Sequence, residues 1–85
     1  MELHIPIGTQ GKEALSVTFE NTAARYGSGL VEVFATPALV ALMESTCLAS
    51  VLPFLSAAWG TVGLNVAIVH TRATPARQRL SCEST

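Results

Sequence analysis

The segment Val33–Leu55, which reads VFATPALVALMESTCLASVLPFL, decides the fold of this 85-residue chain. It holds neither glycine nor proline from Ala38 until Pro53, which stops helical hydrogen bonding, so we predict a long helix. The hydroxyl of Thr36 is expected to cap this helix, with Pro37 at the first helical position. The other segments of the chain are expected to pack around this helix.

The predicted helix is apolar or small nearly all round, and Glu44 is the one charged residue in it. A helix that lacks a polar face belongs in a core, where we expect Cys47 to be a small packed side chain. An ionised carboxylate in apolar surroundings is costly unless it is paired or its pKa rises. Glu44 is therefore the first candidate functional residue, although a carboxylate that points into solvent through a gap fits the same sequence.

The composition limits the class of protein. The chain is 49% hydrophobic and 13% charged with a net charge of −1, which is atypical of disordered or nucleic-acid-binding proteins. Its length suits one small domain. Between Arg25 and Arg72 the only charged residues are Glu32 and Glu44. That long uncharged middle needs to be covered by a sheet, a partner chain or lipid.

Cysteine usage and hydropathy bear on the compartment. Cys47 and Cys82 form neither a disulfide framework nor a metal-binding motif, so we expect no metal. No signal peptide is recognisable, and we expect a reducing, cytoplasmic setting. Residues 35–59 approach the length of a bilayer span. Glu44 near the membrane centre would cost about 2.5–3.5 kcal/mol and Pro53 would break the span, so a small membrane protein is the less favoured alternative.

Two segments alternate as half-buried strands do, namely Lys12–Asn21 and Thr61–His70. The large apolar face of the second is expected to pack on the helix, with His70 at its far end in the same layer as Glu44. A lone histidine there is also compatible with a structural, hydrogen-bonded role. We expect a short apolar segment at residues 30–34 and a polar tail at residues 81–85.

Two motifs then point to a family. They are A-T-P-x5-M-E at residues 35–44 and G-T-x8-H-x2-A-T-P at residues 60–75. In both motifs and in the interval between them, the chain resembles hot-dog-fold thioesterases of the fluoroacetyl-CoA-specific thioesterase family. The resemblance covers roughly residues 15–75, and the combination is more specific than any single catalytic triplet.

The resemblance implies an α+β hot-dog fold, in which an antiparallel sheet wraps around a long central helix, here expected to be incomplete at the C-terminus. It divides the chain into an N-terminal arm at residues 1–11, a partial hot-dog domain at residues 12–76 and a divergent tail at residues 77–85. Arg77 stands where the family usually has glycine. The family assembly is usually a homodimer with the acyl-CoA site between subunits.

The implied activity is hydrolysis of a short-chain acyl-CoA thioester to the acid and CoA. CoA would be part of the substrate, with no separate cofactor. Thr36, Glu44 and His70 match the family's catalytic positions, and Gly60, Thr61 and Arg72 are candidate substrate-binding residues. The residues just before the first motif lack the aromatic gate associated with fluoroacetyl selectivity, so the fluoroacetyl substrate itself is not carried over.

The chemistry of the three catalytic candidates leaves the attacking group open. Glu44 can act as general base or as nucleophile, and His70 can orient it, move a proton or stabilise an oxyanion. The hydroxyl of Thr36 cannot serve both as helix cap and as catalyst. The guanidinium of Arg72 suits a CoA phosphate, although a solvated basic end is the favoured explanation. The alternative function is a non-catalytic hot-dog domain that binds an acyl ligand or a partner chain.

Overall fold

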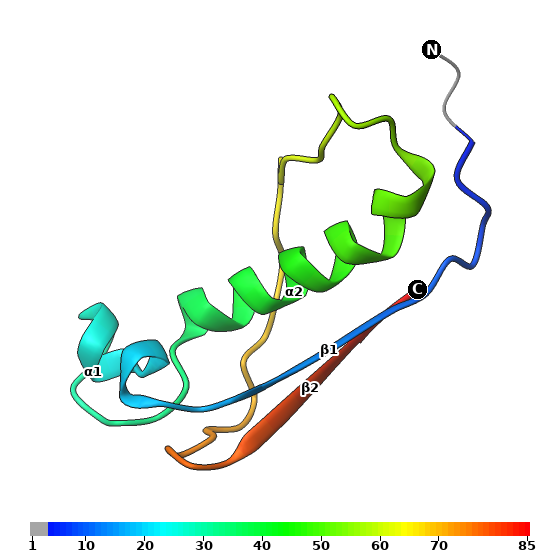
Figure 1. The fold of residues 1–85 in the computed structure, drawn as a ribbon. Helices are drawn as coiled ribbons and strands as arrows, with labels where there is room; N and C mark the ends of the chain where they lie inside the picture. The colour runs from blue at the N-terminus through cyan, green and yellow to red at the C-terminus, as the bar shows by residue number, and fades with distance from the viewer. Residues whose placement is uncertain (1–3) are drawn as a thin grey trace.

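The computed structural model describes residues 4–85, and the first residues of the expected N-terminal arm lie outside that range. Its regular elements, in chain order, are β1 (Gly11–Ser16), α1 (Ala23–Tyr26), α2 (Thr36–Val51) and β2 (Arg79–Ser84). Single turns of 3-10 helix occupy Phe19–Asn21 and Leu52–Phe54. Helix α2 crosses one face of the two-stranded sheet (Figure 1).

The predicted long helix is confirmed as α2, which gives way at Val51 to the 3-10 turn that contains Pro53. The predicted cap is wrong. Ala35 is the N-cap residue, with extended backbone (φ −70°, ψ 141°), and Thr36 is already the first helical residue. The hydroxyl of Thr36 is bonded to His70 rather than to the helix backbone, which removes the competition between capping and chemistry.

Strands β1 and β2 pair antiparallel, from Gly11 opposite Ser84 to Ser16 opposite Arg79. Every second residue faces α2, and Leu15, Leu80 and Cys82 pack there against the core. The predicted first strand is confirmed in its first half, after which the chain turns. The polar tail expected at residues 81–85 is wrong, because its alternation places Cys82 inwards and pairs the segment with β1. The proposed domain boundaries stay a prediction.

The sheet and α2 approach each other closely at Gly11. A Cβ atom built there would lie 2.7 Å from the carbonyl oxygen of Thr46 and 2.8 Å from the Cβ atom of Ser50. Thr46 is fully buried beneath β1, and its hydroxyl lies 2.8 Å from the carbonyl oxygen of Leu42 and 3.1 Å from Glu13. Only glycine fits at this crossing without displacing backbone.

The core is concentrated where α2 begins. Its buried apolar members are Val17, Ala23, Phe34, Ala35, Ala38 and Leu42. Along α2 itself the buried residues recur four apart and form one stripe, at Ala38, Leu42 and Thr46. The expectation of a helix buried on most sides is therefore wrong, and Cys47, expected in the core, is exposed.

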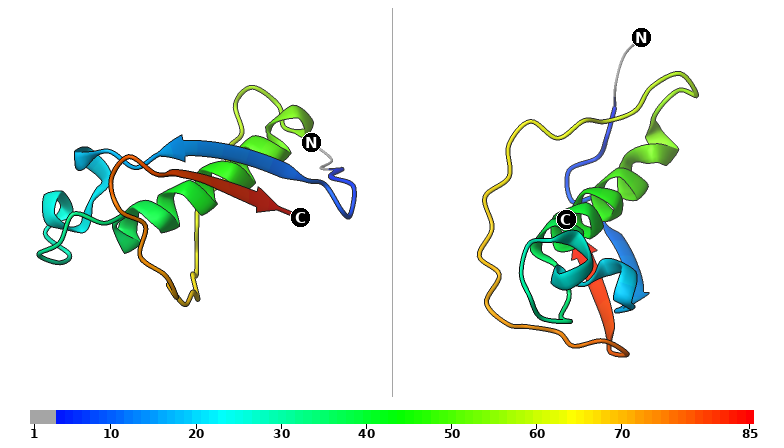
Figure 2. Two further views of the ribbon diagram at one scale, coloured as in Figure 1. Left: turned by 90° about the horizontal axis from the view of Figure 1, so that it is seen from below. Right: turned by 90° about the vertical axis from the view of Figure 1, so that its left-hand side faces the viewer.

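The predicted strand at residues 61–70 is also wrong. The chain is irregular there, and its apolar side chains are in solvent, with Val62 87% and Leu64 97% exposed. The right-hand view of Figure 2 shows this segment on one side of α2, with β1 and β2 on the other. A strand needs a hydrogen-bonded neighbour, and residues 4–85 supply none at this position. The short apolar segment at 30–34 likewise forms only isolated bridges, at Val33 and Phe34.

Within residues 4–85, one helical run, Thr36–Phe54, is long and apolar enough to cross a membrane by length and composition. This is weak evidence for a membrane span, since core helices of soluble proteins meet the same criterion. Here 17% of the most apolar window is buried, and the stripe through Leu42 packs against the rest of the core.

Candidate active site

Backbone hydrogen bonds fix the start of α2 from two directions. The N–H of Phe34 donates to the carbonyl of Thr74 at 2.7 Å, and the N–H of Ala35 donates to the carbonyl of Asn21 at 2.9 Å. A bridge between Val33 and Pro75 extends the first contact. Because buried backbone groups need partners, these bonds hold residues 70–75 against the beginning of the helix.

This anchoring brings together two of the three predicted catalytic residues. The Oγ1 atom of Thr36 lies 2.8 Å from the Nδ1 atom of His70, across 34 positions of sequence. Both line a hollow of about 270 Å³, which we call the Thr36–His70 hollow, together with Ser28, Arg72 and others. Ser28 was not predicted as a site residue, because a serine in a glycine-rich loop carries no sequence signal of its own.

The helix start adds electrostatic help to this pair. The first bond of α2 is donated by the N–H of Leu39 to the carbonyl of Ala35 at 2.9 Å. Amides ahead of Leu39 have no helical acceptor, and the helix dipole makes this end partly positive. A hydroxyl paired with an imidazole beside such amides can activate an oxygen nucleophile and stabilise a developing oxyanion.

Glu44 lies apart from the pair. It follows Thr36 by eight residues on the same helix, which is about 12 Å along the axis at 1.5 Å per residue. It lines a different hollow of about 290 Å³, the Glu44 hollow, with Cys47, Thr61 and Gly63 among the other lining residues. Its side chain is exposed, so of the two alternatives left open by the sequence the solvent-facing carboxylate is the one observed.

Gly63 is a feature of the Glu44 hollow that the sequence analysis missed. A Cβ atom at this position would lie 3.0 Å from Oε2 of Glu44 and 3.3 Å from its Cδ. In the predicted strand Thr61–His70, Gly63 would lie on the face opposite the large apolar side chains and so away from the helix. The chain is not a strand here, so that alternation does not apply, and the missing side chain lets the backbone approach the carboxylate.

The predicted substrate-binding residues separate in the same way. Arg72 lines the Thr36–His70 hollow and Thr61 lines the Glu44 hollow. Gly60 is exposed, and a Cβ atom there would meet nothing within 4 Å. Among the described residues there is no group of three or more histidine, cysteine, aspartate or glutamate side chains able to hold a metal ion. The roles assigned to these residues stay predictions.

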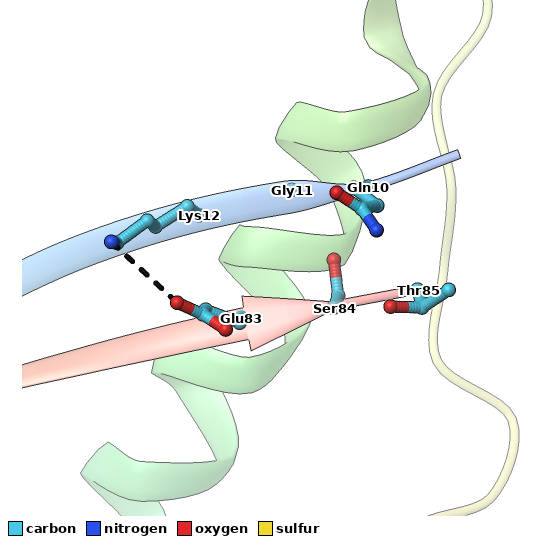
Figure 3. A pocket seen from close by; sticks show the side chains of 6 residues that line it. All are labelled: Gln10, Gly11, Lys12, Glu83, Ser84 and Thr85. Atoms are coloured by element: carbon cyan, nitrogen blue, oxygen red, sulfur yellow. Dashed lines mark ion pairs between the residues drawn. The ribbon is translucent and has the colours of Figure 1, made fainter. Parts of the chain in front are cut away.

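A further hollow lies at the end of the sheet (Figure 3). Its walls come from the beginning of β1 and the end of β2, where Lys12 and Glu83 point toward one another with 3.5 Å between charged atoms. Both side chains are exposed, so the pair is strongly screened by water. None of the residues that line this hollow is a histidine or cysteine, which makes it a poor catalytic candidate.

Comparison with known proteins decides the family. The family model of the fluoroacetyl-CoA-specific thioesterases matches residues 17–85, and so includes both motifs and β2. The chain belongs to this family. A curated relative, the fluoroacetyl-CoA thioesterase of Streptantibioticus cattleyicolor, is 43% identical over 44 residues, which make up 52% of this chain and 32% of that protein.

Solved structures of a fluoroacetyl-CoA thioesterase confirm the hot-dog fold. One is 27% identical with a TM-score of 0.85, and the match covers 94% of this chain and 64% of that one. Another, a threonine-to-serine mutant in complex with acetyl-CoA, is 26% identical with a TM-score of 0.86 and coverages of 93% and 64%. The chain thus spans less than two thirds of the length of these relatives.

Proposed function

We propose that this protein is an acyl-CoA thioesterase that hydrolyses a short-chain acyl-CoA to the free acid and CoA. The observation that carries the proposal is the 2.8 Å hydrogen bond between Thr36 and His70 at the start of α2. It lies in a chain that belongs to a thioesterase family. A solved relative in complex with acetyl-CoA supports the substrate class.

In the reaction, an oxygen atom adds to the thioester carbonyl carbon, the carbon–sulfur bond breaks, and the sulfur leaves as the thiol of CoA after taking up a proton. In this proposal His70 takes the proton of the Thr36 hydroxyl, to which it is hydrogen-bonded, as histidine does for a serine nucleophile. The unpaired amides at the start of α2 are placed to stabilise the oxyanion. Water then releases the acid.

We further propose that the complete site forms in a homodimer, with Glu44 of one copy near the Thr36–His70 hollow of the other. Two observations support this arrangement. Glu44 lies about 12 Å along the helix from Thr36 in its own chain. The apolar segment that contains Val62 and Leu64 is exposed, and large exposed apolar surfaces mark interfaces.

The primary test is release of free thiol from a panel of short acyl-CoAs by the purified chain and its Glu44→Gln variant. Hydrolysis that Glu44→Gln abolishes, and that Glu32→Gln leaves intact, supports the thioesterase with Glu44 in the chemistry. Glu32 is a matched control, because it is exposed and lines neither hollow.

A folded chain that releases no thiol favours the second candidate function, a non-catalytic domain that binds an acyl ligand or partner. The separation of Glu44 from the Thr36–His70 pair is the observation that keeps this candidate open.

The shared site has its own test. Thr36→Ala and Glu44→Gln variants are each expected to be inactive, and mixing them is expected to restore part of the activity. A mixed dimer would hold one site that combines the intact Thr36 of one copy with the intact Glu44 of the other. Sedimentation equilibrium checks that dimers form, and lack of restoration in confirmed mixed dimers would contradict a shared site.

For the setting of the protein we propose the cytoplasm. Cys47 and Cys82 are both free thiols, and a reducing compartment keeps thiols in this state. Fractionation of cells that express the tagged protein tests this assignment.

A further inference from the structure

Arg72 brings an uncompensated positive charge to the Thr36–His70 hollow. Its side chain lines this hollow, and none of the residues that line it is acidic. Within residues 4–85 of a single copy the ion pairs are Lys12 with Glu83 and Arg25 with Glu20, so inside its own chain the guanidinium of Arg72 has no carboxylate partner.

The exposed Arg72 is close to the reacting groups along the chain. Arg72 follows His70 by two residues, so their Cα atoms are at most about 7 Å apart. His70 in turn is hydrogen-bonded to Thr36. The bond from Phe34 to Thr74 holds this segment against the start of α2 and fixes the region of Arg72 relative to the pair.

An unpaired guanidinium in such a hollow suits a planar anion, which it binds through two parallel hydrogen bonds. The phosphates of CoA are separated from the thioester by the whole pantetheine arm. A carboxylate at the end of a short acyl chain lies only a few bonds from the thioester carbonyl. The short separation of Arg72 from His70 along the chain therefore favours an acyl carboxylate over a phosphate as the partner of Arg72.

The rest of the hollow is compatible with a polar acyl group. The hydroxyl-bearing residues Ser28 and Thr71 line it together with the small residue Ala23. Within residues 4–85 the hydroxyl of Ser28 has no hydrogen-bond partner, so it is free to donate to a second oxygen of the ligand.

We propose that this hollow takes an acyl group that ends in a carboxylate, and that Arg72 binds this carboxylate. The preferred substrate is then the CoA thioester of a short dicarboxylic acid, such as malonyl-CoA or succinyl-CoA. This inference rests on the proposed thioesterase function.

The test compares kcat/KM for succinyl-CoA and butyryl-CoA, which differ in the terminal group of the acyl chain. Wild-type protein is expected to prefer succinyl-CoA. In Arg72→Gln the ratio of the two kcat/KM values is expected to fall about 10- to 100-fold, as for the loss of a charge-assisted hydrogen-bonded pair. Arg72→Lys should restore part of the preference. Arg79→Gln is the matched control, because this exposed arginine lies on β2 and lines neither hollow.

Thioesters of N-acetylcysteamine, which lack the phosphates, separate the two kinds of anion. If Arg72→Gln weakens hydrolysis of all CoA thioesters alike but leaves N-acetylcysteamine thioesters unaffected, Arg72 binds phosphate and the inference is overturned. An unchanged succinyl-to-butyryl ratio overturns it as well.

Binding of the product acids keeps this inference separate from the proposed function. If no thioester is hydrolysed, the thioesterase proposal fails, and calorimetry with succinate and butyrate then decides about Arg72. Succinate binding that wild type shows and Arg72→Gln loses supports the carboxylate site. Equal binding by the two proteins, or none, overturns it.

Discussion

Two regions of α2 carry equally clear sequence motifs: the start of the helix and the Glu44 hollow halfway along it. They differ in how far they are buried and hydrogen-bonded to the rest of the chain. At the start of α2, Phe34 is 2% exposed and its backbone is bonded to Thr74. At the Glu44 hollow, the facing segment is exposed and lies outside the two-stranded sheet. Apolar sequence thus leads to burial only where a second surface is available to pack against.

The two regions also differ in the contacts that their candidate catalytic residues make within a single copy of the chain. The pair of Thr36 and His70 is in hydrogen-bond contact within a single copy. Glu44 has no such contact with either residue. The first region is formed within one copy, whereas the carboxylate of Glu44 reaches the Thr36–His70 hollow only in the proposed homodimer. The predictions below test this contrast.

The largest effect is expected from removing the hydroxyl of Thr36. Thr36→Val should lower kcat by about 100-fold or more, since the group paired with His70 is lost. Thr36→Ser should keep most of the activity. The same change in the other region, Thr61→Val, should have a much smaller effect. Thiol release measures all three, and full activity of Thr36→Val would contradict a role for the pair in the chemistry.

The free energy of unfolding should respond differently to the same leucine-to-alanine change in the two regions. Leu42→Ala, at a residue 6% exposed, should lower the free energy of unfolding by about 3 kcal/mol. Leu64→Ala, at a residue 97% exposed, should change it by less than about 0.5 kcal/mol. Urea denaturation followed by circular dichroism measures both. Equal losses would mean that Leu64 is covered in solution, as in the proposed homodimer.

A smaller gain in stability is expected at the turn that leads into β2. Arg77 has a left-handed backbone (φ 74°), and its N–H donates to the carbonyl of Val17 at 2.8 Å. Because side chains are strained in this conformation, Arg77→Gly should stabilise the fold by about 1 kcal/mol. Arg79→Gly, in β2, should destabilise it instead. Thermal unfolding compares the two, and a lower Tm for Arg77→Gly would contradict the strain.

The smallest effect concerns the approach of the backbone to Glu44. In Gly63→Ala the new methyl group would lie 3.0 Å from Oε2 of Glu44 and displace this flexible side chain. We expect kcat/KM to fall by about threefold with stability within about 0.5 kcal/mol of wild type. Gly60→Ala, where a Cβ meets nothing within 4 Å, is the control. Equal kinetics for the two variants would mean that the placement of Glu44 relative to Gly63 has no bearing on turnover.

Local patterns in the sequence correctly predicted two elements, α2 and β1. The run without glycine or proline predicted α2, and the alternation around Leu15 predicted β1. The same kind of alternation wrongly predicted a strand at residues 61–70. Periodicity indicates which side chains share a face, but it does not indicate whether a neighbouring strand is present. The tail was underestimated for a related reason, since β2 depends on pairing with β1, far away in sequence.

The sequence by itself determined the family and the identity of the candidate catalytic residues, because these are carried by residue types at fixed spacing. It also marked Arg77 as unusual, at a position that the structure finds in a left-handed conformation. Only the tertiary structure decided that Thr36 bonds to His70 instead of capping its helix, and that Glu44 lies in a different hollow. Hydrogen bonds between distant segments fix the first relation, and the path of residues 61–63 past α2 fixes the second. No local preference of the chain contains either.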